Sequence, residues 1–130
     1  MTEIRLEQVS YAYGQERILE DINLQVTSGE VVSILGPSGV GKTTLFNLIA
    51  GILEVQSGRI VLDGEENPQG RVSYMLQKDL LLEHKTVLGN IILPLLIQKV
   101  DKAEAVARAD DILATFQLTA VRDKYPHELS

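Results

Sequence analysis

The segment from Gly36 to Thr44 constrains the fold most, because it is a glycine-rich loop between an apolar run and an apolar helix. Gly36, Gly41, Lys42 and Thr43 fit the pattern G-x-x-x-x-G-K-[ST], in which glycines let successive N–H groups turn toward one phosphate. The Lys42 ammonium can reach β- and γ-phosphates, and the Thr43 hydroxyl is a hard oxygen ligand suited to Mg²⁺. The segment therefore predicts a phosphate-binding loop.

The elements on either side of the loop are those that such a loop requires. Val31 to Leu35 is almost continuously apolar and predicts a central strand buried on both faces. Leu45 and Leu48 recur at helical spacing after the loop, so we expect a buried helix that ends before Gly51 and points its positive end at the phosphate. The alternative is a glycine-rich turn without a ligand, which the order of strand, motif and helix disfavours.

Composition and charge narrow the class of protein. The 130 residues, 45% of them hydrophobic, suffice for one domain with a core. The net charge of −6 disfavours a general nucleic-acid binder, whose phosphate contacts need surplus Lys and Arg. The chain has no cysteine, which excludes disulfides and permits a reducing compartment. We expect no secretory signal, because Glu3, Arg5 and Glu7 interrupt the start of the chain. We expect no membrane span, because the most apolar stretch, Val87 to Val100, is short and interrupted.

The remaining pattern predicts further strands and two helices. Alternating or short apolar runs predict strands over residues 4–13, 17–26, 59–62 and 72–76. Asp63-Gly64 is a turn pair, so Ile60 to Asp63 is interpreted as half of a hairpin and not as a metal-binding strand. One helix is expected after Thr86, an N-cap, in an apolar stretch that runs to Leu96, with a stop or a kink at Pro94; a second is expected after Asp101, another N-cap. Four positions of the second helix share one apolar face: Val106, Ala109, Leu113 and Phe116.

Four features around the loop resemble those of the ATPase subunits of ABC transporters. They are, in chain order, Tyr13 followed by Gly14, the hairpin from Ser57 to Gly64, Tyr74 to Gln77 before a leucine-rich stretch, and Tyr125 to Ser130. They resemble the family's adenine-stacking aromatic, its hairpin, its glutamine loop, and the lead-in and first two residues of its signature motif. The resemblance runs from Ile4 to Ser130 and implies an α/β fold of the P-loop NTPase type.

This resemblance also implies an organisation of the chain. Residues 1–130 would form a single, C-terminally truncated nucleotide-binding domain: an antiparallel β-subdomain over 1–30, a P-loop core with a truncated sheet over 31–77, and part of a helical subdomain over 78–130. The family's second apolar strand, with its metal-binding Asp and catalytic Glu, and its switch histidine have no counterpart here. We expect the unpaired edge of Val31 to Leu35 to cause swapping, edge-to-edge pairing or aggregation of this chain alone.

The resemblance assigns roles to individual residues. The residues implied to bind ATP or ADP are Tyr13, Ser38, Gly39, Val40, Gly41, Lys42, Thr43 and Thr44. Thr43 and Gln77 are the implied Mg²⁺ ligands, and Gln77 would also position the attacking water in a partial catalytic site. Ser130 belongs to the element that meets the γ-phosphate of the opposite subunit in this family.

Several residues have a second interpretation. Tyr11 and Tyr13 share one face of an alternating strand, so the pattern alone does not choose the stacking residue, whereas Gly14 and the family favour Tyr13. The two histidines, His84 and His127, lack ligand-spaced partners and are interpreted as surface residues.

Charged pairs and apolar runs outside the loop can be interpreted as ordinary structural features. Glu65-Glu66 and Asp110-Asp111 are interpreted as solvated charge, because no apolar residues flank them on both sides to raise a pKa. The apolar runs Leu80 to Leu82 and Val87 to Leu96 are either core of the helical subdomain or a docking groove for a membrane subunit.

The function implied is that of the ATP-binding subunit of an ABC transporter, which powers import. Its implied partners are a second ATPase subunit and a membrane subunit, with no nucleic acid and no direct membrane insertion. Its implied location is cytoplasmic, at the inner face of the plasma membrane. The run from Leu76 to Leu82 is similar to importers of the nitrate, sulfonate, taurine or thiamine-precursor type.

Because the catalytic Glu is missing, we expect this chain to bind nucleotide weakly without efficient hydrolysis. Two alternatives are a natural non-catalytic half-domain that binds nucleotide or regulates a transporter, and a related ATPase outside transport. The net charge disfavours the second.

Overall fold

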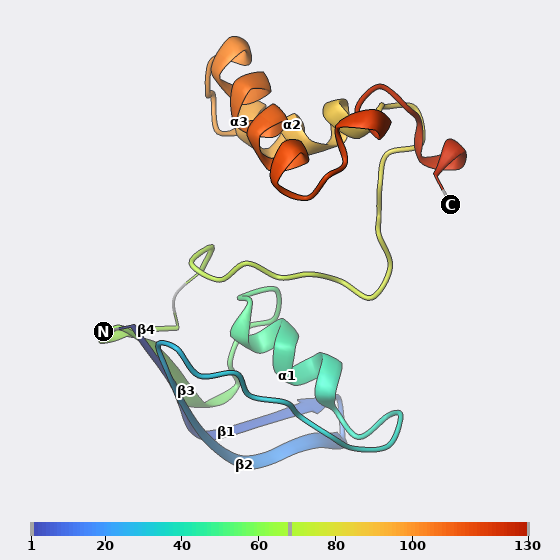
Figure 1. Cartoon of the computed structure of the whole chain (residues 1–130). Helices are drawn as coiled ribbons and strands as arrows, with labels where there is room; N and C mark the ends of the chain where they lie inside the picture. Colours follow the sequence, from blue (N-terminus) through green and yellow to red (C-terminus); the bar gives the residue numbers. More distant parts are fainter. Residues whose placement is uncertain (1, 68, 130) are drawn as a thin grey trace. The chain divides into compact units, whose positions relative to one another are not determined.

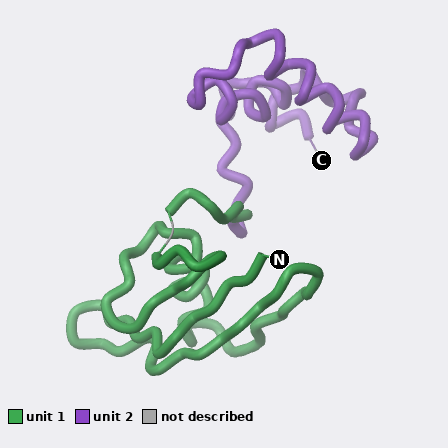
Figure 2. Tube along the Cα trace, turned by 90° about the vertical axis from the view of Figure 1, so that its left-hand side faces the viewer, with its two compact units in different colours: residues 1–75 green, residues 76–130 purple. Residues whose placement is uncertain are grey.

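The computed structural model describes residues 2–67 and 69–129. The chain divides into two compact units, residues 1–75 and residues 76–130, which Figure 2 shows in different colours. Unit 1 contains a sheet and one α-helix, and unit 2 is helical.

Four strands of unit 1 form one antiparallel sheet in the order β2-β1-β3-β4 (Figure 1). They are β1 (Glu3–Tyr13), β2 (Glu16–Thr27), β3 (Ser57–Leu62) and β4 (Glu65–Glu66). The turn between β3 and β4 has φ of 51° at Asp63 and 85° at Gly64, the two left-handed residues that a tight hairpin turn needs. The predicted opening hairpin and the Asp63-Gly64 turn are therefore confirmed.

β1 is the central strand because it pairs with β2 at one edge and with β3 at the other. Leu6 lies opposite Leu24 of β2 and opposite Ile60 of β3. Both ladders shift register after this point, near Gln8, whose φ is 51°. The Asn23 side chain accepts a 2.9 Å hydrogen bond from the Gln8 N–H, so a side-chain amide satisfies backbone where the ladder is irregular.

The helix α1 (Lys42–Ile49) packs on one face of this sheet (Figure 1). Its buried residues are joined to those of the strands in one core cluster: Leu6, Val9, Leu19, Leu45, Leu48 and Ile60. Ala50 is the C-cap, and Gly51 follows with φ of 73°, so the predicted end of the helix is confirmed.

Two predicted strands are absent from the described residues. Val31 to Leu35 has no strand conformation; Val31 is 95% exposed and Leu35 is 91% exposed, and only Ile34 packs partly against the core. Val72 to Leu76 also lacks strand pairing, although the Tyr74 ring stacks on Phe46 of α1 with centroids 6.5 Å apart. A strand buried on both faces needs hydrogen-bonded neighbours, and neither segment is paired with a strand of this sheet. Apolar composition was therefore not enough to form these strands.

Unit 2 contains α2 (Val87–Ile97), α3 (Lys102–Thr115) and two short 3-10 helices, η1 (Thr119–Val121) and η2 (Pro126–Glu128). Both predicted N-caps are confirmed: the Thr86 hydroxyl accepts from the Gly89 N–H at 3.1 Å, and the Asp101 carboxylate accepts from the Ala103 N–H at 2.9 Å. Of the two expected outcomes at Pro94, a stop or a kink, the stop does not occur, because α2 continues past Pro94 to Ile97.

The core of unit 2 is the contact between α2 and α3. Ala105 and Ala109 of α3 are both 0% exposed and pack with Ile92 of α2, because small side chains let two helices approach closely. Phe116 was expected on the same face but is exposed, since α3 ends at Thr115.

The Asn90 side chain attaches the preceding loop to α2. Its Oδ1 accepts from the Leu82 N–H at 2.8 Å, and its Nδ2 donates to the carbonyls of Leu82, Lys85 and Thr86.

Within the residues that the structure describes, the helices are too short or too polar to cross a membrane.

Gly58, the glycine of β3, should tolerate substitution poorly. Its φ is +77°, and a Cβ there would lie 2.2 Å from the Gln8 carbonyl oxygen and 2.4 Å from that of Glu7. We expect Gly58→Ala to lower the free energy of unfolding by more than ~2 kcal/mol, because it combines a left-handed backbone with a clash against β1. Urea unfolding followed by circular dichroism measures this.

Gly64→Ala is the matched control for this experiment. Gly64 has φ of +85°, but no atom lies within 4 Å of an added Cβ. This variant should lose only the backbone cost of ~1–2 kcal/mol. Equal losses in the two variants would contradict the proposed close approach of β1 and β3.

The ion pair between Asp110 and Arg122 should contribute to the acid sensitivity of unit 2. Arg122 Nε lies 2.6 Å from Asp110 Oδ1, and this hydrogen bond holds the pKa of Asp110 below its ordinary value. A carboxyl whose pKa is lower in the folded state stabilises the fold above its unfolded-state pKa, and this stabilisation disappears as the pH falls through the folded-state pKa. We therefore expect part of the loss of thermal stability between pH 7 and pH 3 to be absent in Asp110→Asn.

Thermal unfolding at a series of pH values tests this, with Asp111→Asn as the control. Asp111 is the neighbouring carboxylate, for which the described residues show no ion pair. Parallel pH profiles for wild type and Asp110→Asn would contradict the expected contribution of the pair.

Candidate phosphate-binding site

The predicted phosphate loop lies directly before α1, on the side of the sheet at which β1 ends (Figure 1). Gly41 precedes the helix with φ of +103°. A Cβ on Gly41 would lie 2.8 Å from Ile18 Cγ2 and 3.1 Å from the Ile18 carbonyl oxygen. Glycine at this position therefore lets the start of α1 lie against the backbone of β2.

The N-terminus of α1 is open to an anion. No side chain caps the helix, and none of its first-turn residues is acidic. The first N–H groups of a helix have no intrahelical acceptor, and they form the positive end of the helix dipole. Thr44 is buried, whereas Thr43 is exposed. This arrangement can bind phosphate through backbone N–H groups and leave Thr43 available to a metal ion.

Lys42 is folded back over its own loop. Its Nζ donates to the Pro37 carbonyl at 2.8 Å and also to the Gly36 carbonyl. These bonds tie the first residues of the loop to the first residue of α1. A phosphate oxygen is a stronger acceptor for an ammonium than a neutral carbonyl is, so a bound phosphate can replace these partners.

Tyr13 lies at the end of β1 and is 50% exposed. Tyr11 is packed against the core cluster, and the two rings meet edge to face with centroids 5.0 Å apart and an interplanar angle of 77°. Tyr13 thus presents more of its ring to solvent, and Tyr11 supports it from the side.

Gln56 was not identified from the sequence. Its Oε1 accepts from the Ala12 N–H at 2.9 Å, and its Nε2 donates to the Ala12 carbonyl at 3.0 Å. Ala12 directly precedes Tyr13, so Gln56 contacts the backbone that carries the exposed ring. No spacing or motif marked this glutamine, because the contact joins positions 44 residues apart.

The other predicted site residues lie elsewhere. Gln77 is an exposed residue of unit 2, in the irregular chain before Thr86. Ser130 lies outside the described residues. The structure therefore brings together Ser38 to Thr44 in unit 1, and each unit contains a part of the predicted site.

The two histidines belong to unit 2, and the acidic pair Glu65-Glu66 belongs to the β4 strand of unit 1. His84 and His127 are exposed, and His127 stacks on Tyr125 with ring centroids 5.9 Å apart. Glu65 and Glu66 are exposed and pair with Arg71 at 2.8 Å and Arg59 at 2.7 Å. Across the described ranges, no group of three acidic or histidine side chains is placed to hold a metal ion.

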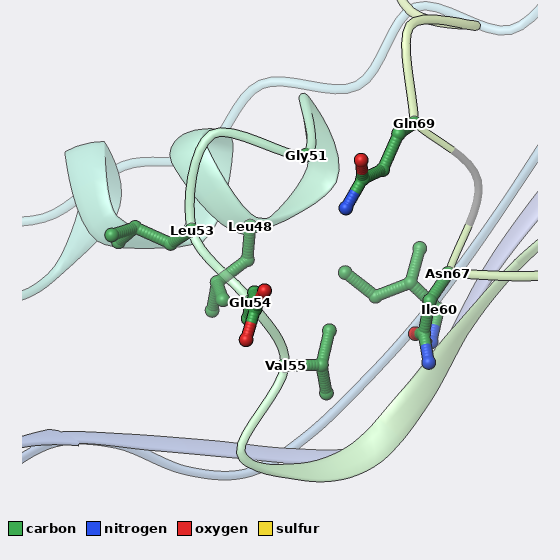
Figure 3. Close-up of a pocket in the computed structure, with 8 residues that line it drawn as sticks. All are labelled: Leu48, Gly51, Leu53, Glu54, Val55, Ile60, Asn67 and Gln69. Carbon is green, nitrogen blue, oxygen red and sulfur yellow. The ribbon is translucent and has the colours of Figure 1, made fainter.

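A pocket of about 230 Å³ lies near the opposite end of α1 (Figure 3). Apolar residues such as Leu48, Val55 and Ile60 line it together with the polar side chains of Glu54 and Gln69. Carbonyl groups gather at the C-terminal end of a helix, where the dipole is negative, and Glu54 adds a carboxylate. This pocket is therefore unsuited to phosphate, and the loop before α1 is the better anion site.

Comparison with known proteins agrees with the interpretation of residues 36–44 as a phosphate-binding loop. Residues 19–130 match a family model described as ABC transporter. The spermidine/putrescine import ATP-binding protein PotA of Aggregatibacter actinomycetemcomitans is 39% identical over 132 residues, covering 98% of this chain and 36% of that protein. The sulfate/thiosulfate import ATP-binding protein CysA of Synechococcus elongatus is 39% identical over 132 residues, covering 98% of this chain and 38% of that protein. The chain thus spans little more than a third of these relatives.

Solved structures give the same result. The ATP-binding cassette MJ1267 of an ABC transporter matches with a TM-score of 0.85 and 28% identity over 100% of this chain and 60% of that chain. The ATP-binding cassette MJ0796, a dimer bound to ADP and Pi in a post-hydrolysis state, matches with a TM-score of 0.78 and 27% identity over 98% of this chain and 63% of that chain. The named relatives include polyamine and sulfate importers, so they give no support to the nitrate, sulfonate, taurine or thiamine-precursor subgroup.

Lys42 should dominate the affinity of the loop for a polyphosphate without a base. We expect Lys42→Ala to raise the Kd for inorganic tripolyphosphate about tenfold or more, because the ammonium supplies the only full positive charge within Gly36 to Thr44. Isothermal titration calorimetry measures the Kd. Lys102→Ala, at the start of α3, is the control for a general change in charge. Similar Kd values for the two variants would show that the loop does not bind through Lys42.

Proposed function

Because this chain belongs to the ABC transporter family of ATP-binding domains, we propose that it is the nucleotide-binding part of an importer's ATPase subunit. The observation that carries the proposal is the uncapped N-terminus of α1 behind a glycine loop with Lys42 and Thr43, inside a family match over residues 19–130. A phosphate-binding helix terminus of this kind recognises the triphosphate group of a nucleotide.

The proposed nucleotide contacts divide between base and phosphates. The residues from Ser38 to Thr44 bind the phosphates through their N–H groups, and Lys42 adds charge at the β- and γ-phosphates. Tyr13 stacks on the adenine; the half-exposed ring at the end of β1 supports this role. Tyr11 has the supporting role, because its ring is packed against the core.

The residues present fit Mg²⁺ as the accompanying ion. Thr43 is an exposed residue at the helix start with a hydroxyl, and the exposed Gln77 has an amide oxygen. Both groups are hard oxygen donors of the kind that Mg²⁺ prefers. Bound Mg²⁺ neutralises charge on the β- and γ-phosphates. We propose Thr43 and Gln77 as its protein ligands, with Gln77 also orienting water.

We propose that these 130 residues bind ATP or ADP without efficient turnover. The sequence contains no Asp-Glu pair after a second apolar strand. Asp63, which follows an apolar strand and is the candidate for the metal-binding carboxylate, is engaged in other contacts. Its Oδ1 accepts from the Glu3 N–H at 2.8 Å, and Arg71 lies 3.8 Å from its Oδ2. Asp63 therefore connects β1 to a hairpin turn, and its carboxylate is engaged in these contacts instead of activating water.

The proposed partners are a second ATPase subunit and a membrane subunit, at the cytoplasmic face of the plasma membrane. The dimer of MJ0796 and the import functions named for PotA and CysA support this. Importers named for cationic polyamines and for anionic sulfate match this chain at the same 39% identity. We propose that these residues do not choose the transported substrate and that other subunits select it.

Calorimetric titration of the folded chain with ATP and Mg²⁺ tests the binding, and a continuous phosphate-release assay tests turnover. We expect measurable but weak binding that Lys42→Ala removes, with no steady phosphate release. Absence of any binding by a folded sample would overturn the proposed function. Steady release that disappears in Lys42→Ala would keep the binding role and overturn the absence of turnover.

A further inference from the structure

We propose that Gln56 is a positioning residue for the nucleotide base, because it holds the backbone that presents Tyr13. This inference rests on the proposed function and goes beyond it, since it assigns a role to a residue outside the phosphate loop. Gln56 precedes β3 and lies in neither the loop nor a recognised motif.

β1 extends past the point where β3 can support it. On the β3 edge, the last register pair in the described residues is Ser10 with Ser57. Beyond it, Ala12 and Tyr13 pair only with Arg17 and Glu16 of β2, at the other edge. The end of β1 therefore has strand support on one edge alone.

The support from β2 is also irregular at this place. Tyr11 lies opposite Leu19 whereas Ala12 lies opposite Arg17, so Ile18 is an extra residue of β2. Such a bulge interrupts the ladder and increases the local twist. The last residues of β1 consequently need another contact to have one fixed orientation.

The Gln56 side chain supplies this contact by making the hydrogen bonds that a neighbouring strand would make. Its amide accepts from the Ala12 N–H at 2.9 Å and donates to the Ala12 carbonyl at 3.0 Å. A residue in a hydrogen-bonded antiparallel pair exchanges the same two bonds with its partner. Gln56 thus continues the β3 edge by one side chain and fixes the peptide groups on both sides of Ala12.

The direction of the Tyr13 side chain follows from this backbone. The peptide that joins Ala12 to Tyr13 contains the carbonyl that Gln56 binds. The Tyr11 ring, 5.0 Å from the Tyr13 ring, then supports the aromatic side chain from its edge. Preorganising the ring before the base arrives reduces the entropy lost on stacking, so removal of Gln56 should weaken base binding selectively.

The decisive variant is Gln56→Met, which keeps the length of the side chain and removes both hydrogen bonds. We expect the Kd for ATP to rise about three- to tenfold, the effect of losing one or two exposed hydrogen bonds. The Kd for inorganic tripolyphosphate, which has no base, should not change. Gln69→Met is the matched control, because Gln69 is another exposed glutamine of unit 1 that lines the pocket of Figure 3.

A double-mutant cycle shows whether Gln56 acts through Tyr13. In a Tyr13→Ala background, Gln56→Met should cause no further rise in the Kd for ATP. Hydrogen exchange observed by NMR gives a readout without nucleotide: the Ala12 amide should exchange faster in Gln56→Met than in wild type or Gln69→Met. Both results together would assign the positioning role.

The outcomes separate this inference from the proposed function. If wild type binds ATP and Gln56→Met leaves the ATP Kd unchanged, or raises the ATP and tripolyphosphate Kd values equally, the inference is overturned and the proposed function stands. An equal rise in Kd with and without Tyr13 also overturns it. If folded wild type binds neither ligand, the proposed function fails and the inference fails with it.

Discussion

The hydrogen bonding of β1 at both of its edges is the constraint on which the rest of unit 1 depends. β2 and β3 are far apart in sequence, and they are brought into one sheet only because each pairs with β1. This sheet supplies the apolar face on which Leu45 and Leu48 of α1 pack. The packed helix in turn has its N-terminus at the phosphate loop, so the anion site is positioned by strands that contribute no ligand to it.

The features that could be predicted from the sequence are those that depend on a few neighbouring residues. The glycine loop, the Asp63-Gly64 turn and the caps at Thr86 and Asp101 each depend on a few adjacent residues, and their φ angles and hydrogen bonds follow from those residues alone. Val31 to Leu35 failed as a strand because strand formation depends on partners, which an apolar pattern does not reveal. The Gln56 contact was also invisible for this reason, since it joins a side chain to backbone in a distant strand.

The proposed roles assign binding and chemistry to different parts of the chain. The groups proposed to recognise an anion belong to unit 1: helix N–H groups, Lys42 and Thr43. Gln77, the residue proposed to orient water, belongs to unit 2. Under these assignments, substitutions in unit 1 change affinity and substitution of Gln77 changes turnover, so the two quantities can be measured independently.

The exposed run from Val31 to Leu35 leads into Gly36 without an intervening turn. Each residue of this run has two soft dihedrals, φ and ψ, and no strand pairing restrains them. A displacement of the run can therefore be absorbed within it before it reaches Gly36. The position of the phosphate loop then depends on its covalent attachment to α1 and on the hydrogen bonds that the Lys42 ammonium donates to Gly36 and Pro37.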